Sequence, residues 1–186
     1  MSDEKYSYPT YAKLIHLGIA LFGITAFLTG ELAEEGGASI GYLLHSYLGL
    51  SLAAMMVVRI SIGFTSSEAL SFKGWSPFSL QQWQLALEDF RTISGLKVPE
   101  RGRHQGLSGI TQAFGLLIFI WMSLTGAALF MLGSGIESEV FEFVEEVHEI
   151  GESLIPLYLV LHVGAVILHT LCGNPIWKEM FSHKSS

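Results

Sequence analysis

Residues 153–177 read SLIPLYLVLHVGAVILHTLCGNPIW, a stretch without Asp, Glu, Lys or Arg. A transmembrane α-helix needs about 20 mainly apolar residues. Three further windows lack these charged residues as well: 14–30, 36–58 and 104–136. The pattern predicts an all-α membrane protein, a four-transmembrane-helix bundle in which residues 1–186 form a single membrane domain.

The overall composition agrees with this prediction. Of 186 residues, 50% are hydrophobic and 15% are charged, whereas about a quarter are charged in a typical soluble domain. Cys172 is the single cysteine, which excludes a disulfide framework or a cysteine-based metal cluster within the chain. The start, MSDEK, lacks a basic n-region, so we expect no cleavable signal peptide.

Basic and acidic residues lie in different connections. If the spans alternate in direction, all ten basic residues fall on one side of the membrane: Lys5, Lys13, Arg59, Lys73, Arg91, Lys97, Arg101, Arg103, Lys178 and Lys184. The other two connections are acidic, with Glu31, Glu34 and Glu35 in one and seven glutamates between 137 and 152 in the other. The positive-inside rule predicts a multi-pass protein of the bacterial inner (cytoplasmic) membrane with both termini in the cytoplasm. The net charge of −7 averages two unlike faces, and nothing supports nucleic-acid binding.

The spans are predicted at about 14–31, 40–63, 108–133 and 149–172. Apolar residues at helical spacing from Leu80 to Phe90 indicate a short amphipathic helix on the membrane surface, for which we favour anchoring over partner docking. A second, acidic amphipathic helix over 137–152 leads into span four, which Gly173-Asn174-Pro175 should end. Span three has no internal ionisable residue and is expected to serve packing.

Four histidines, His16, His45, His148 and His162, lie within or at the edge of these spans. An ionisable side chain in hydrocarbon costs at least a few kcal/mol and usually marks a function. The predicted topology places His16 and His162 toward the inner surface, and His45 and His148 toward the outer one. His162 follows His148 by close to four helical turns, so both point the same way, roughly 21 Å apart in depth.

Two planar cofactors, each held by two imidazoles, explain this arrangement best. The outer pair is His45 with His148, and the inner pair is His16 with His162. Haem b is the cofactor that fits, because its macrocycle fills a bundle interior and its iron takes axial histidine. Two protein ligands would leave no open iron position, so the haems would carry electrons across the bilayer. By depth alone, His169 is as good an inner ligand as His162, and Arg59 is equally suited to pair with a haem propionate or to extend toward water.

These residues resemble the bacterial cytochrome b561 family, which includes the b-type cytochrome subunit of nickel–iron hydrogenases. The resemblance lies in Leu14-Ile15-His16, in His45-Ser46-Tyr47-Leu48-Gly49, in Val147-His148-Glu149 and in the stretch from Leu161 to His169. It covers nearly the whole chain in the same order. At His104-Gln105-Gly106 the chain departs from the family's usual His-Asn-Pro.

The resemblance implies two haem b groups and favours His162 over His169 as the inner ligand. It also implies electron transfer between a redox partner (a dehydrogenase, a hydrogenase-like or a cytochrome c-type subunit) and the membrane quinone pool. His169 and the cytoplasmic ends of the spans are then candidates for a quinone or proton-transfer site. A homodimer is compatible with the sequence.

Two other functions are weighed against this electron-transfer subunit. The first is a stand-alone enzyme similar to superoxide oxidase, which oxidises superoxide and reduces quinone; the acidic outer connections disfavour it, because superoxide is an anion. The second is a haem-free protein whose histidines move ions or protons. A single shared zinc site is excluded, because the outer and inner pairs are too far apart.

Overall fold

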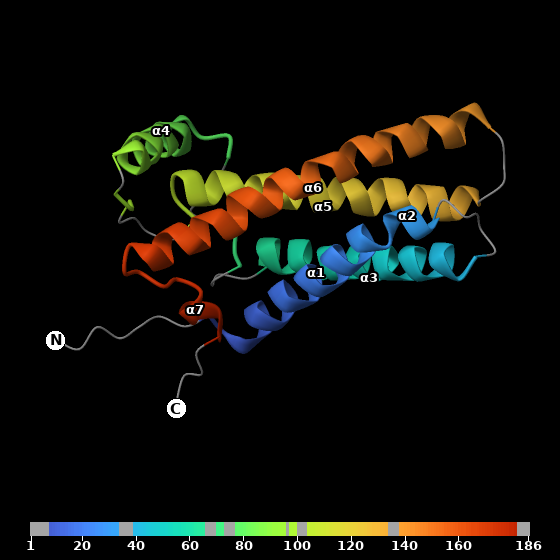
Figure 1. The fold of residues 1–186 in the computed structure, drawn as a ribbon, viewed down its shortest axis with the longest axis horizontal. Coiled ribbons are helices and arrows are strands. Elements are labelled where there is room, and N and C mark those ends of the chain that lie inside the picture. The colour runs from blue at the N-terminus through green and yellow to red at the C-terminus, as the bar shows by residue number, and fades with distance from the viewer. Residues whose placement is uncertain are drawn as a thin grey trace. The chain divides into compact units, whose positions relative to one another are not determined.

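The computed structural model describes residues 8–33, 39–65, 70–72, 77–95, 97–99, 104–133 and 138–181. Its helices, shown in Figure 1, are α1 (Thr10–Leu28), α2 (Gly30–Ala33), α3 (Ile40–Thr65), α4 (Leu80–Ser94), α5 (Leu107–Leu132), α6 (Glu139–Leu171) and α7 (Lys178–Phe181). No strand occurs in this part of the chain. The helices α1, α3, α5 and α6 are each long and apolar enough to cross a membrane. The prediction of an all-α protein with four spans is therefore confirmed.

Helix α6 joins the predicted acidic helix to span four in one continuous helix, as the sequence predicted. It runs for 33 residues. The Ser138 hydroxyl accepts a hydrogen bond from the Phe141 N–H at 3.1 Å, and glutamates in the first turn favour the positive end of the helix dipole. The predicted end is confirmed: Gly173 has φ 85, and the Asn174 N–H donates to the His169 carbonyl at 2.9 Å.

The chain divides into two compact units. We call Ile15–Ser61 with Leu116–Leu157 the histidine unit, because it contains the outer pair. We call Met1–Leu14, Ile62–Gly115 and Tyr158–Ser186 the α4 unit. Each is described by itself, and the single membrane domain over 1–186 stays a prediction.

Small residues bring the helices of the histidine unit close together. A Cβ on Gly18 of α1 would lie 2.6 Å from Met55 Cε of α3, and one on Gly151 of α6 would lie 2.6 Å from Met122 Sδ of α5. Long apolar side chains such as Ile118, which is 1% exposed, fill the space between the helices. Close packing through glycine is a common way to associate helices in lipid. It fixes the backbones that position the outer pair.

In the α4 unit, α4 lies beside the beginning of α5 (Figure 1). The predicted amphipathic helix is confirmed as α4. Its first turn is capped by Ser79, whose hydroxyl accepts from the Gln82 N–H at 3.2 Å. Further along α5, Gly115 makes room for the Tyr158 ring of α6, which a Cβ at that position would overlap.

Candidate functional site

His45 and His148 lie side by side in the histidine unit. His45 is in the second turn of α3 and His148 in the third turn of α6. Their ring centroids are 6.3 Å apart and the ring planes are nearly perpendicular, at 86°. The structure thus brings together the two residues of the predicted outer pair.

The orientation of the His45 ring is set by α1. Its Nδ1 lies 3.0 Å from the Ala26 carbonyl oxygen. A carbonyl oxygen only accepts hydrogen bonds, so Nδ1 must carry the proton and donate. The lone pair of neutral His45 is therefore on Nε2, the atom left for binding a metal.

The His148 ring is held by α5. Its Nδ1 lies 2.7 Å from the Thr125 hydroxyl oxygen. That hydroxyl also lies 2.9 Å from the Trp121 carbonyl oxygen. When it donates its proton to this carbonyl, it accepts from the His148 Nδ1–H, and the lone pair of His148 is then also on Nε2.

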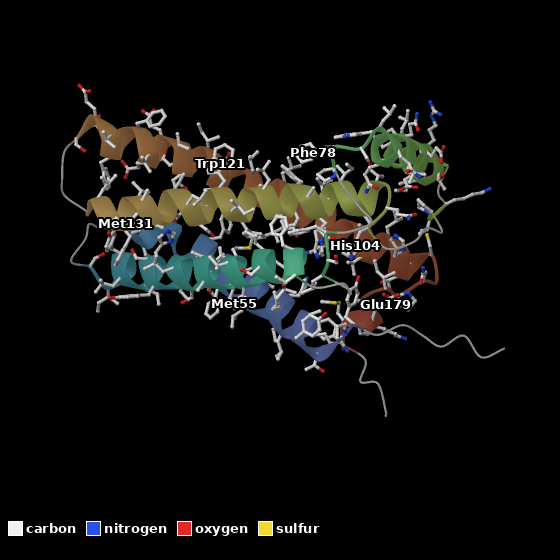
Figure 2. The ribbon with its side chains drawn as sticks, turned by 180° about the vertical axis from the view of Figure 1, so that it is seen from behind. Met55, Phe78, His104, Trp121, Met131 and Glu179 are labelled. Atoms are coloured by element: carbon white, nitrogen blue, oxygen red, sulfur yellow. The ribbon has the colours of Figure 1, made fainter. Side chains whose placement is uncertain are left out.

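Two further contacts locate the His148 backbone and ring. The Trp121 indole N–H of α5 donates to the Val147 carbonyl at 3.0 Å, next to His148 in the chain (Figure 2). On the same face of α5, a Cβ on Gly126 would lie 3.2 Å from His148 Cε1. Glycine at this position lets the imidazole approach the α5 backbone.

An open space adjoins His45. Gly49 follows His45 by one helical turn on the same face of α3. Apart from the adjoining α3 backbone, no atom of the described residues lies within 4 Å of the position that a Cβ would take. Most other glycines of the spans, by contrast, meet a side chain or backbone there. A flat ligand can therefore approach the α3 backbone beside the imidazole.

The donor set narrows the kind of metal site. Among the described residues, no group of three or more His, Cys, Asp or Glu side chains could hold a metal ion. A metal bound by His45 and His148 would then need further ligands, and a cofactor with its own metal-binding nitrogens is one source of them. The geometry favours a metal-containing prosthetic group over a bare ion.

The inner residues are placed differently. In the α4 unit, the His162 ring stacks on Tyr158 of the same helix, with centroids 5.5 Å apart and planes at 23°. Two turns further along α6, His169 has a buried Nδ1 that makes no hydrogen bond within the described part of the chain. Of the two candidates for the inner ligand, His162 is thus the one whose ring is oriented by a neighbouring aromatic side chain.

His16 and Arg59 both belong to the histidine unit. His16 is exposed on α1, and Arg59 of α3 is only 5% exposed. The pairing of His16 with His162, which is in the other unit, stays a prediction.

Sequence reasoning missed the residues that orient the imidazoles. Span three was expected to serve packing, yet it supplies the Thr125 hydroxyl. A hydroxyl in an apolar span is a weak signal that a polar neighbour lies nearby. The Ala26 carbonyl has no such signal, because every residue has a backbone carbonyl.

Comparison with known proteins gives the family. A family model for prokaryotic cytochrome b561 matches residues 7–183, nearly the whole chain. No curated protein and no solved structure matches. The four membrane-spanning helices agree with this match. The chain belongs to the prokaryotic cytochrome b561 family, whose members are multi-pass bacterial membrane proteins that transfer electrons with b-type haem.

Proposed function

We propose that this protein is a di-haem cytochrome b that moves electrons across the bilayer between a redox partner protein and the quinone pool. His45 and His148 hold the outer haem, and His16 and His162 hold the inner one. The observation that supports this most is the outer pair, in which both imidazoles present Nε2 while Nδ1 is hydrogen-bonded.

The spacing of the outer pair fits an iron between two imidazoles. Metal–imidazole bonds of about 2 Å on each side separate the two nitrogens by about 4 Å, and each ring centroid lies about 1.2 Å further out. The sum is close to the 6.3 Å between the His45 and His148 centroids. The open position beside Gly49 leaves room for a macrocycle near the ligand.

Ligation by two histidines determines what such a site does. A haem iron with both axial positions filled accepts and releases single electrons but has no position for a substrate. The protein's part is to present two neutral imidazoles in one tautomer and to keep the ring directions constant by the Ala26 and Thr125 hydrogen bonds. We therefore favour electron transfer over a self-sufficient enzyme.

The spacing of residues along α3 and α6 supports the position proposed for the inner haem. Arg59 follows His45 by the same fourteen positions that separate His162 from His148. In the topology predicted from the sequence, both residues therefore lie toward the inner surface. The side chain of Arg59 is buried, so it does not extend toward water.

The distribution of charged residues supports the proposed orientation in the membrane and the side on which a redox partner would bind. By the positive-inside rule, the basic connections favour a cytoplasmic location for both termini. Glu142, Glu145, Glu146 and Glu149 are exposed near the start of α6, on the side of the outer pair. We expect the redox partner to approach this end and quinone to react near the other end, where His169 lies.

Spectroscopy and haem analysis of purified protein test the proposal. We expect a b-type reduced-minus-oxidised spectrum, two haems per chain and reoxidation of the reduced haems by added quinone. One haem per chain would contradict the di-haem proposal, and absence of a b-type spectrum would favour the haem-free alternative. Superoxide-dependent quinone reduction by the isolated chain would favour the stand-alone enzyme.

A further inference from the structure

Helix α4 has three distinct faces. The first is buried and consists of Gln82, Ala86 and Asp89. The second is exposed and apolar, and the third is exposed and polar. The apolar face comprises Leu80, Trp83, Leu87 and Phe90, and the polar face comprises Gln81, Gln84, Glu88 and Arg91. At 3.6 residues per turn, the apolar face is centred roughly 110° from the buried face and the polar face roughly 100° further around the helix.

The buried face ties α4 to the entrance of span α5. The carboxylate of Asp89 accepts from the backbone N–H of Leu107, the first residue of α5, at 2.9 Å. The side-chain amide of Gln82 donates to the carbonyls of His104 and Gly106 at 3.0 and 3.2 Å. Both side chains are at most 4% exposed. Buried groups with satisfied hydrogen bonds hold α4 in one rotation about its axis.

The turn before α5 has a backbone conformation that allows the buried face of α4 to pack closely against it. His104 and Gly106 have φ values of 58 and 62. A Cβ on Gly106 would overlap the Asp89 carboxylate, and one on Gly109 would overlap the Gln82 amide. The backbone therefore approaches α4 as closely as glycine allows.

Attachment to Leu107 sets the depth of α4. Since α5 is a membrane span that begins at Leu107, a helix bonded to its first N–H lies at the boundary between lipid and water. Four large apolar side chains that are 52–74% exposed then continue the lipid-facing surface of the span. Phe78, just before α4, is 94% exposed as well (Figure 2).

We propose that the apolar face of α4 is embedded in the bilayer interface and that its occupant is lipid. The side-chain N–H of Trp83 already donates to the Pro77 carbonyl at 2.8 Å, so the indole enters the acyl region without an unpaired donor. Arg91 and Lys97 are exposed beside this face and suit anionic headgroups. The polar face of α4 remains in water, as expected of an interfacial helix.

Spin labelling of the haem-loaded protein in anionic vesicles tests this. In a Cys172→Ser background, single variants Trp83→Cys and Leu87→Cys place a nitroxide on the apolar face, and Gln81→Cys and Gln84→Cys serve as matched controls on the polar face. We expect the ratio of collisions with oxygen to collisions with a water-soluble nickel chelate to be several-fold higher on the apolar face. An unchanged haem spectrum confirms that each variant is folded.

Other outcomes overturn the proposal. Equally low ratios on both faces would place the apolar face in water, and equally high ratios would contradict the placement of the polar face in water. Dipolar broadening between labels at 83 or 87 would identify a second copy of the chain as the occupant. Tryptophan fluorescence gives an independent check that needs no cysteine variant. The contribution of Trp83 is the part of the fluorescence that is lost in Trp83→Phe, and brominated lipids should quench this part. Absence of this quenching would contradict contact between Trp83 and lipid. The result does not depend on the number of haems, so it is separable from the proposed function.

Discussion

His148 and His162 lie on the same helix, yet the structure orients them in different ways. His148 is oriented by α5, through a hydrogen bond to Thr125, and it faces His45 of α3. His162 is oriented from within α6, by stacking on Tyr158 one turn earlier. The comparison shows that two histidines on the same face of one helix can be oriented by different neighbours. The direction of the His148 ring depends on three helices being packed together, whereas that of His162 is set largely within one helix.

Substitution of the proposed haem-ligating histidines should have the largest effect, on the haem content of the protein. We expect His148→Ala to lower the haem content from two to one per chain, because an axial ligand is lost, and His162→Ala to remove the other haem. The two variants should lose different components of the reduced-minus-oxidised spectrum and of the potentiometric titration.

His169→Ala is the control for the inner ligand and should keep both haems. If His162→Ala keeps both haems while His169→Ala loses one, the inner pairing is wrong. If both His45→Ala and His148→Ala leave the haem content at two, the outer pairing is wrong.

Loss of the Thr125 hydroxyl should affect the outer haem alone. A hydrogen bond from Nδ1–H makes an imidazole more electron-rich and stabilises ferric iron. Thr125→Val removes an interaction worth about 1 kcal/mol. Only the part of it that differs between ferric and ferrous iron changes the potential, so we expect the midpoint potential of the outer haem to rise by at most about 40 mV, at 59 mV per 1.4 kcal/mol. Potentiometric titration of both haems measures this shift.

Ser123→Ala is the matched control, because the Ser123 hydroxyl donates to Phe119 within α5 and does not bond to a histidine. A shift of the inner haem in Thr125→Val, or an equal shift in Ser123→Ala, would show that Thr125 does not act through His148.

The aromatic ring of Tyr158 should keep the His162 ligand of the inner haem in one orientation. We expect Tyr158→Leu to broaden the electron paramagnetic resonance signal of the inner haem, because the His162 plane loses the ring stacked 5.5 Å away. Tyr158→Phe keeps the ring and should restore the signal. Identical spectra for the Leu variant and the native protein would show that stacking does not orient His162.

Gly126→Ala should have the smallest effect. The added Cβ would lie 3.2 Å from His148 Cε1, so the ring must move by a few tenths of an ångström, at a cost of about 1 kcal/mol or less. We expect a small spectral change of the outer haem and full haem content. Loss of that haem would mean that the packing between α5 and His148 is tighter than the structure indicates.

Much of the fold follows from local patterns. Uncharged windows of sufficient length predict the four spans, because backbone hydrogen bonds must be satisfied internally in lipid and a helix does this without a partner. The C-terminal end of α6 follows from Gly173, and the existence of α4 follows from the apolar spacing between Leu80 and Phe90. The continuity of α6 follows from the apolar stripe of the acidic segment, which leads directly into span four.

The sequence by itself determined which residues are available: four histidines in apolar surroundings, at depths set by helical rise and by the distribution of charge. Only the tertiary structure decided how they are presented. It brings His45 and His148 to 6.3 Å and joins one to the Ala26 carbonyl and the other to the Thr125 hydroxyl. It also turns Gln82 and Asp89 of α4 toward the protein and Trp83 outward. The physical reason is that the spacing of residues along a helix fixes the direction and depth of their side chains. A hydrogen bond between two helices depends instead on the distance between them and on the rotation of each helix about its axis, and these are set only by packing.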